Sequence, residues 1–172
     1  DALESMVWLL MNRWAVVRQS SDARAEKLAT VPDWLAFGLA QHLYPELRAR
    51  NAGLVQERWR NGQLTPWDTL AGQEVLPPGR WAAKAESALL VNWLLDRRVP
   101  FESVWNRCAS HLPLDAEWLS RELLGLEDVG KVTVEWELWM ATRQERHYGV
   151  STLDRDQVSE LESLTRFDVV DL

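Results

Sequence analysis

The chain has little of the side-chain chemistry that cross-links a small protein or holds a metal. Its 172 residues include one cysteine, Cys108, and three histidines. A single cysteine excludes an intramolecular disulfide and makes a cysteine-based metal site implausible. The apolar neighbours of Cys108, among them Trp105, favour a small buried hydrophobic side chain. The alternative is a reactive thiol assisted by His111, which lies three residues further on.

Long apolar runs and blocks of like charge are also missing. The longest apolar run, Met6–Met11, is far shorter than the roughly 20 residues of a membrane-spanning helix, so we expect no transmembrane segment. The net charge is -7 with both signs spread along the chain, which argues against a nucleic acid partner. No signal peptide is visible, and because the first residue is Asp1 we expect a longer or processed chain.

What the chain does have is the spacing of apolar residues by three and four that marks amphipathic helices. This pattern recurs almost throughout and predicts one all-α domain over residues 1–172. In the first helix it assigns one buried face to Leu3, Met6, Val7, Leu10, Trp14 and Val17. The expected helices are Ala2–Arg18, Pro32–Tyr44, Ala52–Arg60, Thr65–Leu70, Trp81–Arg97, Phe101–Ser110, Ala116–Leu124, Val134–His147 and a last one ending near Leu164. The only β-like stretches are Val129–Val134 and Phe167–Val170.

Tryptophan is unusually frequent, with 11 residues in the chain. A row of exposed tryptophans would suggest sugar binding, but these are scattered at one or two per expected helix, among aliphatic neighbours. We therefore expect most of them to be buried or half-buried packing residues.

The most specific stretch is Val31–Ala40, which reads Val-Pro-Asp-Trp-Leu-Ala-Phe-Gly-Leu-Ala. It resembles the glutamate helix of zinc peptidases of the gluzincin type, which reads roughly Pro-x-Trp-Leu-x-Glu-Gly-Leu-Ala. In that family the glutamate is the third zinc ligand, and Phe37 stands at its position here. The weaker likeness of Trp81–Arg98, Phe101–Leu112 and Val134–Arg146 to later helices of such domains extends the resemblance to about residue 146.

The companion His-Glu-x-x-His motif is expected in the helix Leu3–Arg18, which contains no histidine. Zinc hydrolysis needs two histidines at i and i+4 on one helix face and a third ligand from another helix. The candidate positions hold Trp8 with Asn12, or Asn12 with Val16, and none of these pairs can bind zinc. The degenerate site positions are therefore Trp8, Asn12, Trp34 and Phe37, and we predict no catalytic, metal or cofactor residue.

The resemblance implies a non-catalytic, metallopeptidase-like domain that binds a partner or stabilises a larger chain. We expect the helices Leu3–Arg18 and Pro32–Tyr44 to pack side by side, with Phe37 near Trp8 or Met11, because a vacated metal cavity destabilises a protein unless it is filled. One alternative is an unrelated helical protein-interaction module, and another is a hydrolase with an unrecognised site.

The resemblance carries further expectations about the rest of the molecule. Zincins place a twisted sheet before the histidine-bearing helix, whereas this sequence starts at the helix, so we expect the sheet to be absent or removed. Relatives of this type are often exported in bacteria, which implies a periplasmic or secreted location. The mixed surface charge is compatible with a protein partner.

Overall fold

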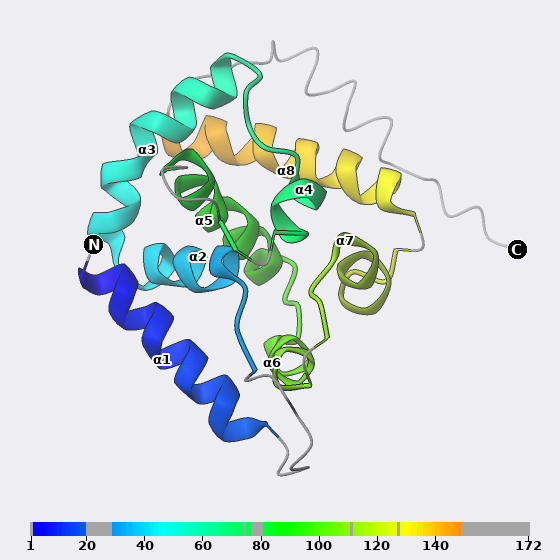
Figure 1. Ribbon diagram of the computed structural model, residues 1–172. Coiled ribbons are helices and arrows are strands. Elements are labelled where there is room, and N and C mark those ends of the chain that lie inside the picture. Colours follow the sequence, from blue (N-terminus) through cyan, green and yellow to red (C-terminus); the bar gives the residue numbers. More distant parts are fainter. Residues whose placement is uncertain are drawn as a thin grey trace, which may run out of the picture. The chain divides into compact units, whose positions relative to one another are not determined.

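The computed structural model of the protein describes residues 2–19, 29–73, 75–76, 81–110, 112–126 and 128–148, without the side chains of 123 and 144–148. Every regular element in these residues is a helix, which confirms the all-α prediction (Figure 1). They are α1 (Ala2–Arg18), α2 (Asp33–Leu43), α3 (Pro45–Arg60), α4 (Trp67–Ala71), α5 (Trp81–Asp96), α6 (Phe101–Ala109), α7 (Ala116–Trp118), the π-helical turn η1 (Leu119–Leu123) and α8 (Val129–Tyr148).

The chain divides into two compact units, Asp1–Val132 and Thr133–Leu172, with the boundary inside α8. The expected single domain therefore stays a prediction. None of the described helices combines the length and apolar character that crossing a membrane requires.

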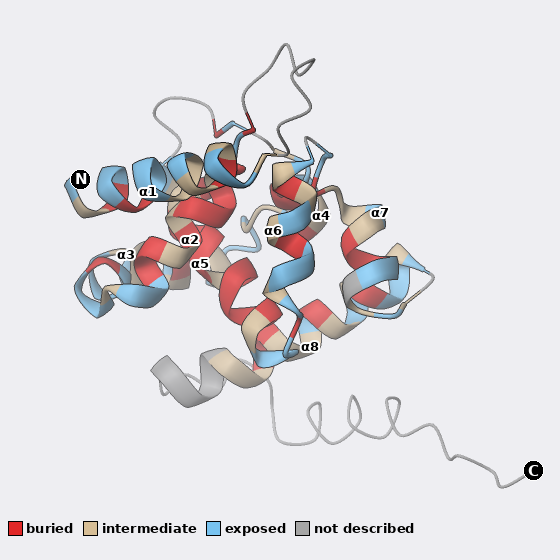
Figure 2. Cartoon of the chain, turned by 90° about the horizontal axis from the view of Figure 1, so that it is seen from below, coloured by how far each residue is buried: buried red, intermediate tan, exposed pale blue. Residues whose placement is uncertain are grey.

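The core of the first unit is built on α2 and α5, which pack directly against each other. Ten of the 16 residues of α5 and six of the 11 residues of α2 are buried. Figure 2 accordingly colours much of both helices red. The two backbones approach closely at Gly38, where a Cβ atom would lie 2.5 Å from the carbonyl oxygen of Ser87 and 2.5 Å from Cγ2 of Val91. Both α1 and α3 pack against α2, and α3 also contacts α5.

Tryptophans fill much of this interior, as expected. Nine of the 11 are buried or half-buried, and the exceptions are Trp8 and Trp81. Trp34, Trp67 and Trp93 are fully buried, and the rings of Trp67 in α4 and Trp93 in α5 pack tilted with centroids 5.8 Å apart. These large side chains bury most of their apolar surface and contribute strongly to the stability of the unit.

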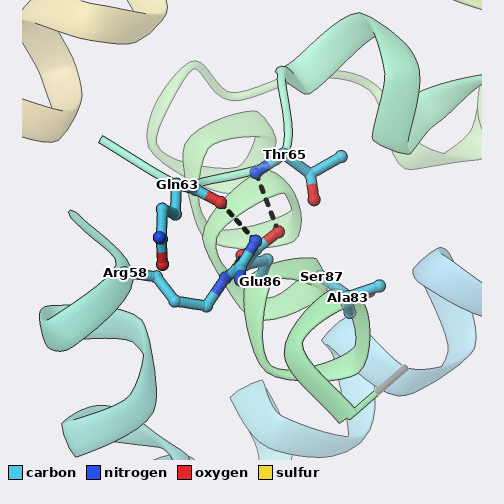
Figure 3. Close-up of polar contacts among 6 residues, drawn as sticks. All are labelled: Arg58, Gln63, Thr65, Ala83, Glu86 and Ser87. Atoms are coloured by element: carbon cyan, nitrogen blue, oxygen red, sulfur yellow. Dashed lines mark hydrogen bonds and ion pairs between the residues drawn. The ribbon is translucent and has the colours of Figure 1, made fainter. Parts of the chain in front are cut away.

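One ion pair joins α3 to α5 inside this unit (Figure 3). The carboxylate of Glu86, 2% exposed, accepts from Nε of Arg58 at 2.5 Å and from the backbone N–H of Thr65 at 3.1 Å. Arg58 also donates through Nη2 to the carbonyl oxygen of Gln63. The pair therefore fixes the segment after α3 against the start of α5.

Two expected helix boundaries were wrong. α3 is longer than the expected Ala52–Arg60: it begins at Pro45, where the sequence allowed either a kink or the start of a new helix, because proline is favoured in the first turn of a helix. The β-like stretch Val129–Val134 is the start of α8, where Asp128 Oδ1 accepts the backbone N–H of Gly130 at 2.7 Å as a helix cap. The stretch Phe167–Val170 and the expected last helix lie outside the described residues.

The expected buried face of α1 was also partly wrong. The residues that pack inward are Leu3, Val7 and Met11, which join Ala40, Tyr44 and Leu47 in one apolar cluster. Met6, Leu10 and Val17 are exposed instead. Because the whole run from Met6 to Met11 is apolar, its spacing does not distinguish one face from the other, and the packing of α2 decides which face is buried.

Candidate functional site at the motif helix

The helices α1 and α2, on which the degenerate site was predicted, lie side by side and antiparallel. Asn12 bonds to Val31, whereas Trp8, one turn earlier on α1, bonds to Asp33, which comes later in the chain. This opposite order of the paired residues is the order expected for antiparallel helices. The prediction that these two helices pack side by side is confirmed (Figure 1).

Trp8 and Asn12 hold the start of α2 in place. The indole N–H of Trp8 donates to Oδ1 of Asp33 at 2.8 Å, and Oδ2 of Asp33 accepts the backbone N–H of Leu76 at 3.0 Å. Oδ1 of Asn12 accepts the backbone N–H of Val31 at 3.0 Å, while its Nδ2 donates to the carbonyl oxygen of Trp8 at 2.9 Å. Both side chains are thus committed to contacts within the protein.

Phe37 is half-buried and meets α5. The ammonium of Lys84 lies 3.9 Å from the centroid of the Phe37 ring and 5.5 Å from that of Trp81, so the amine sits between two aromatic rings. The expected contact of Phe37 with Trp8 or Met11 stays a prediction. Trp34, also assigned to the degenerate site, is fully buried in the core, so it does not contribute to a surface.

A pocket of about 190 Å³ opens beside this lysine. It is lined by Glu4 of α1, Arg50 and Asn51 of α3, and Trp81 and Lys84 of α5. Glu4 is only 3% exposed, whereas the Trp81 side chain is 67% exposed. The pocket therefore combines a buried carboxylate, two cations, an amide and an open aromatic face.

Gln41 of α2 ties two walls of this pocket together. Its Nε2 donates to the backbone carbonyl oxygen of Lys84 at 2.5 Å, and its Oε1 accepts from Nδ2 of Asn51 at 3.0 Å. Gln41 is 1% exposed, so these bonds form away from water and hold α3 and α5 in a fixed relation.

Glu4 and Asn12, one turn before and one turn after Trp8 on α1, meet different parts of the protein. Glu4, one turn before Trp8, shares the pocket with Lys84, whose ammonium covers the Phe37 ring. Asn12, one turn after Trp8, bonds to Val31 before α2 begins, and Asp33 alone is already about 6 Å from Phe37 along the helix axis. Glu4 therefore lies in the neighbourhood of Lys84, whereas Asn12 lies beside the segment that precedes α2.

A second, more open pocket of about 340 Å³ lies on α6, α7 and η1. Several of its side chains contact one another: the Arg107 guanidinium lies 4.6 Å from the Trp118 ring centroid, and Arg121 pairs with Glu117 at 2.5 Å. Asp115 caps α7 by accepting the backbone N–H of Trp118 at 2.8 Å. These contacts within the protein account for the pocket as a feature of how the short helical segments around α7 pack.

The remaining chemically interesting residues do not converge. Within the described parts of the chain, no three histidine, cysteine, aspartate or glutamate side chains are grouped to hold a metal ion. The exposed His42 pairs its Nδ1 with Oδ1 of Asn92 at 2.8 Å. Cys108 is 2% exposed, as expected, and burial raises the pKa of its thiol to about 12. His111 and the side chain of His147 lie outside the described residues.

No protein-family model, curated protein or solved structure matches this chain.

Proposed function

We propose that this chain is a non-catalytic, gluzincin-like helical domain that binds a ligand or partner beside its motif helix. The observation that supports the proposal is the packing of α1 against α2, with Trp8 bonded to Asp33 at the start of α2 and Glu4 lining the pocket beside Lys84, which covers the Phe37 ring.

The chemistry of the three side chains supports a binding role rather than hydrolysis. Zinc in peptidases is held by imidazole nitrogens and carboxylate oxygens that converge from two helices. Trp8 offers only an N–H donor, which Asp33 accepts, and Phe37 offers an apolar ring, which Lys84 covers. Glu4 is the one residue of the three with a metal-binding group, and one carboxylate is too few for a zinc site.

The first experiment measures the zinc content of the full chain, purified without chelator and again after zinc addition and desalting, together with cleavage of a mixed peptide substrate. We expect neither bound zinc nor cleavage. Stoichiometric, tightly held zinc would overturn the proposal. Cleavage by the zinc-free chain would instead favour a hydrolase with an unrecognised site.

A second experiment tests the geometry by restoring ligands in two registers. The variant Glu4→His/Trp8→His/Phe37→Glu puts one histidine at the pocket position beside Lys84 and the other at the position that bonds to Asp33 at the start of α2. The variant Trp8→His/Asn12→His/Phe37→Glu contains the same ligand types with the histidines one turn further along α1. We expect tighter zinc binding by the first variant, with circular dichroism confirming that both are folded. Equal zinc affinity of the two folded variants would contradict the peptidase-like arrangement.

A further inference from the structure

We propose that the pocket between α1, α3 and α5 binds a small monocarboxylate, with Lys84 holding the carboxylate group and Trp81 covering an apolar body. This inference rests on the proposed binding function and names the class of ligand. It is argued from the charges, the exposure and the size of the pocket.

Lys84 is the group that such a ligand would neutralise. Lys84 is half-buried, its ammonium lies near the rings of Phe37 and Trp81, and the ion pairs among the described residues do not include it. Glu4 and Arg50, by contrast, each take part in interactions within the protein. The ammonium of a half-buried lysine that lies against aromatic rings has lost part of its hydration, so an incoming carboxylate gains more there than at a fully exposed lysine.

The rest of the lining limits the ligand to one negative charge. Arg50 and Lys84 against Glu4 leave a formal charge of +1 at pH 7. The buried Glu4 carboxylate repels a second carboxylate, which disfavours diacids and phosphate esters. Asn51 uses one amide N–H on Gln41 and retains a second N–H, which can donate to the same carboxylate as Lys84.

The shape of the pocket limits the size of the ligand. Its volume of about 190 Å³ is below the roughly 300–1,000 Å³ of pockets for drug-sized molecules. It therefore fits a fragment such as an aryl acetate or the last residue of a peptide. Trp81, 67% exposed at the edge of the pocket, offers an indole face for stacking with the apolar part. A free small acid and a peptide C-terminus share this chemistry.

The test measures binding of phenylacetate to the full chain by ligand-observed NMR and calorimetry, with neutral phenylacetamide and dianionic phenylmalonate as matched probes. We expect phenylacetate to bind and the two other probes to bind much more weakly. In Lys84→Met the affinity for phenylacetate should fall roughly 10- to 100-fold, as expected for loss of a charged hydrogen-bond donor. Lys131→Met, at an exposed lysine on α8 outside the pocket, is the control and should bind as the wild type does.

Phenylacetate binding that is absent, equals that of phenylacetamide, or is unchanged in Lys84→Met would overturn the inference. Two peptides that end in phenylalanine, one with a free carboxylate and one amidated, then identify the source of the ligand. Tighter binding of the free-acid peptide than of phenylacetate assigns the pocket to a peptide C-terminus, and weaker binding assigns it to a free small acid. These readouts do not depend on zinc, so a failure here is distinguishable from a failure of the non-catalytic proposal.

Discussion

At the scale of single residues, the two side chains of the Arg58–Glu86 ion pair differ in their exposure to solvent. The Arg58 side chain is 26% exposed and can turn to solvent, whereas Glu86 is 2% exposed and cannot. Removing Arg58 therefore leaves a buried carboxylate without its charge partner, and Arg58→Met should lower the free energy of unfolding by about 3–5 kcal/mol. Urea denaturation at neutral pH measures this loss.

Two further variants make the argument about Arg58 specific. Arg60→Met removes the same charge from an exposed position two residues later in α3 and should change stability by less than about 0.5 kcal/mol. Arg58→Met/Glu86→Met replaces both charges with apolar groups and should recover much of the loss, since no charge then remains buried. Equal effects of Arg58→Met and Arg60→Met would show that the pair contributes nothing.

Residue types alone led to Phe37 as the key position of the motif, but they could not identify its partner. The aromatic contact with Lys84 joins residues from two helices that are distant in sequence. A lysine three residues after a tryptophan on a helix is an ordinary pattern, so Trp81 and Lys84 gave no signal of a pocket. In the sequence, Glu4 stands out only as the single acidic residue of its helix. Its burial could not be predicted, because it follows from how α1 packs.

At the scale of helices, the approach of α2 to α5 depends on the absence of a side chain at Gly38. Gly38→Ala should destabilise the protein by about 1–3 kcal/mol, because the new methyl group meets the backbone of Ser87 as well as Val91. Gly53→Ala in α3 is the matched control. Its Cβ would meet nothing within 4 Å, so the higher helix propensity of alanine should stabilise by up to about 1 kcal/mol.

Thermal and urea unfolding of the two alanine variants test this difference directly. Stabilisation by both substitutions would mean that α2 and α5 are further apart in solution than the structure has them. The close approach of the two helices thus gives Gly38 a packing role.

Helix existence was predictable from periodicity, whereas boundaries and faces were less so. The spacing of apolar residues identified the helical segments from α1 to α8 because each has one packed side. Val129–Val134 was misread because β-branched residues also suit strands, and the cap at Asp128 that starts a helix there carries little weight in a short window. The buried face of α1 was misread because its own apolar side chains point to all sides of that helix.

At the scale of the first unit, the candidate site exists only because several helices of the chain pack together. Its pocket takes side chains from α1, α3 and α5, while Gln41 of α2 fixes two of the walls. No single helix contains a recognisable fragment of it. The sequence could therefore predict the all-α class and the pairing of α1 with α2 but not the pocket, since that needs the relative placement of four helices.

The same assembly predicts how the first unit opens. α5 has ten buried residues of 16, whereas α3 has only two of 16, so α3 can separate locally while α5 opens only when the unit unfolds. Native-state hydrogen exchange should give opening free energies near the global value for the amides of α5 and α2, and lower values along α3. The global value from urea unfolding of the same sample is the reference. Amides of α3 as protected as those of α5 would contradict this order and would mean that Arg58 and Glu86 couple the two helices into one cooperative element.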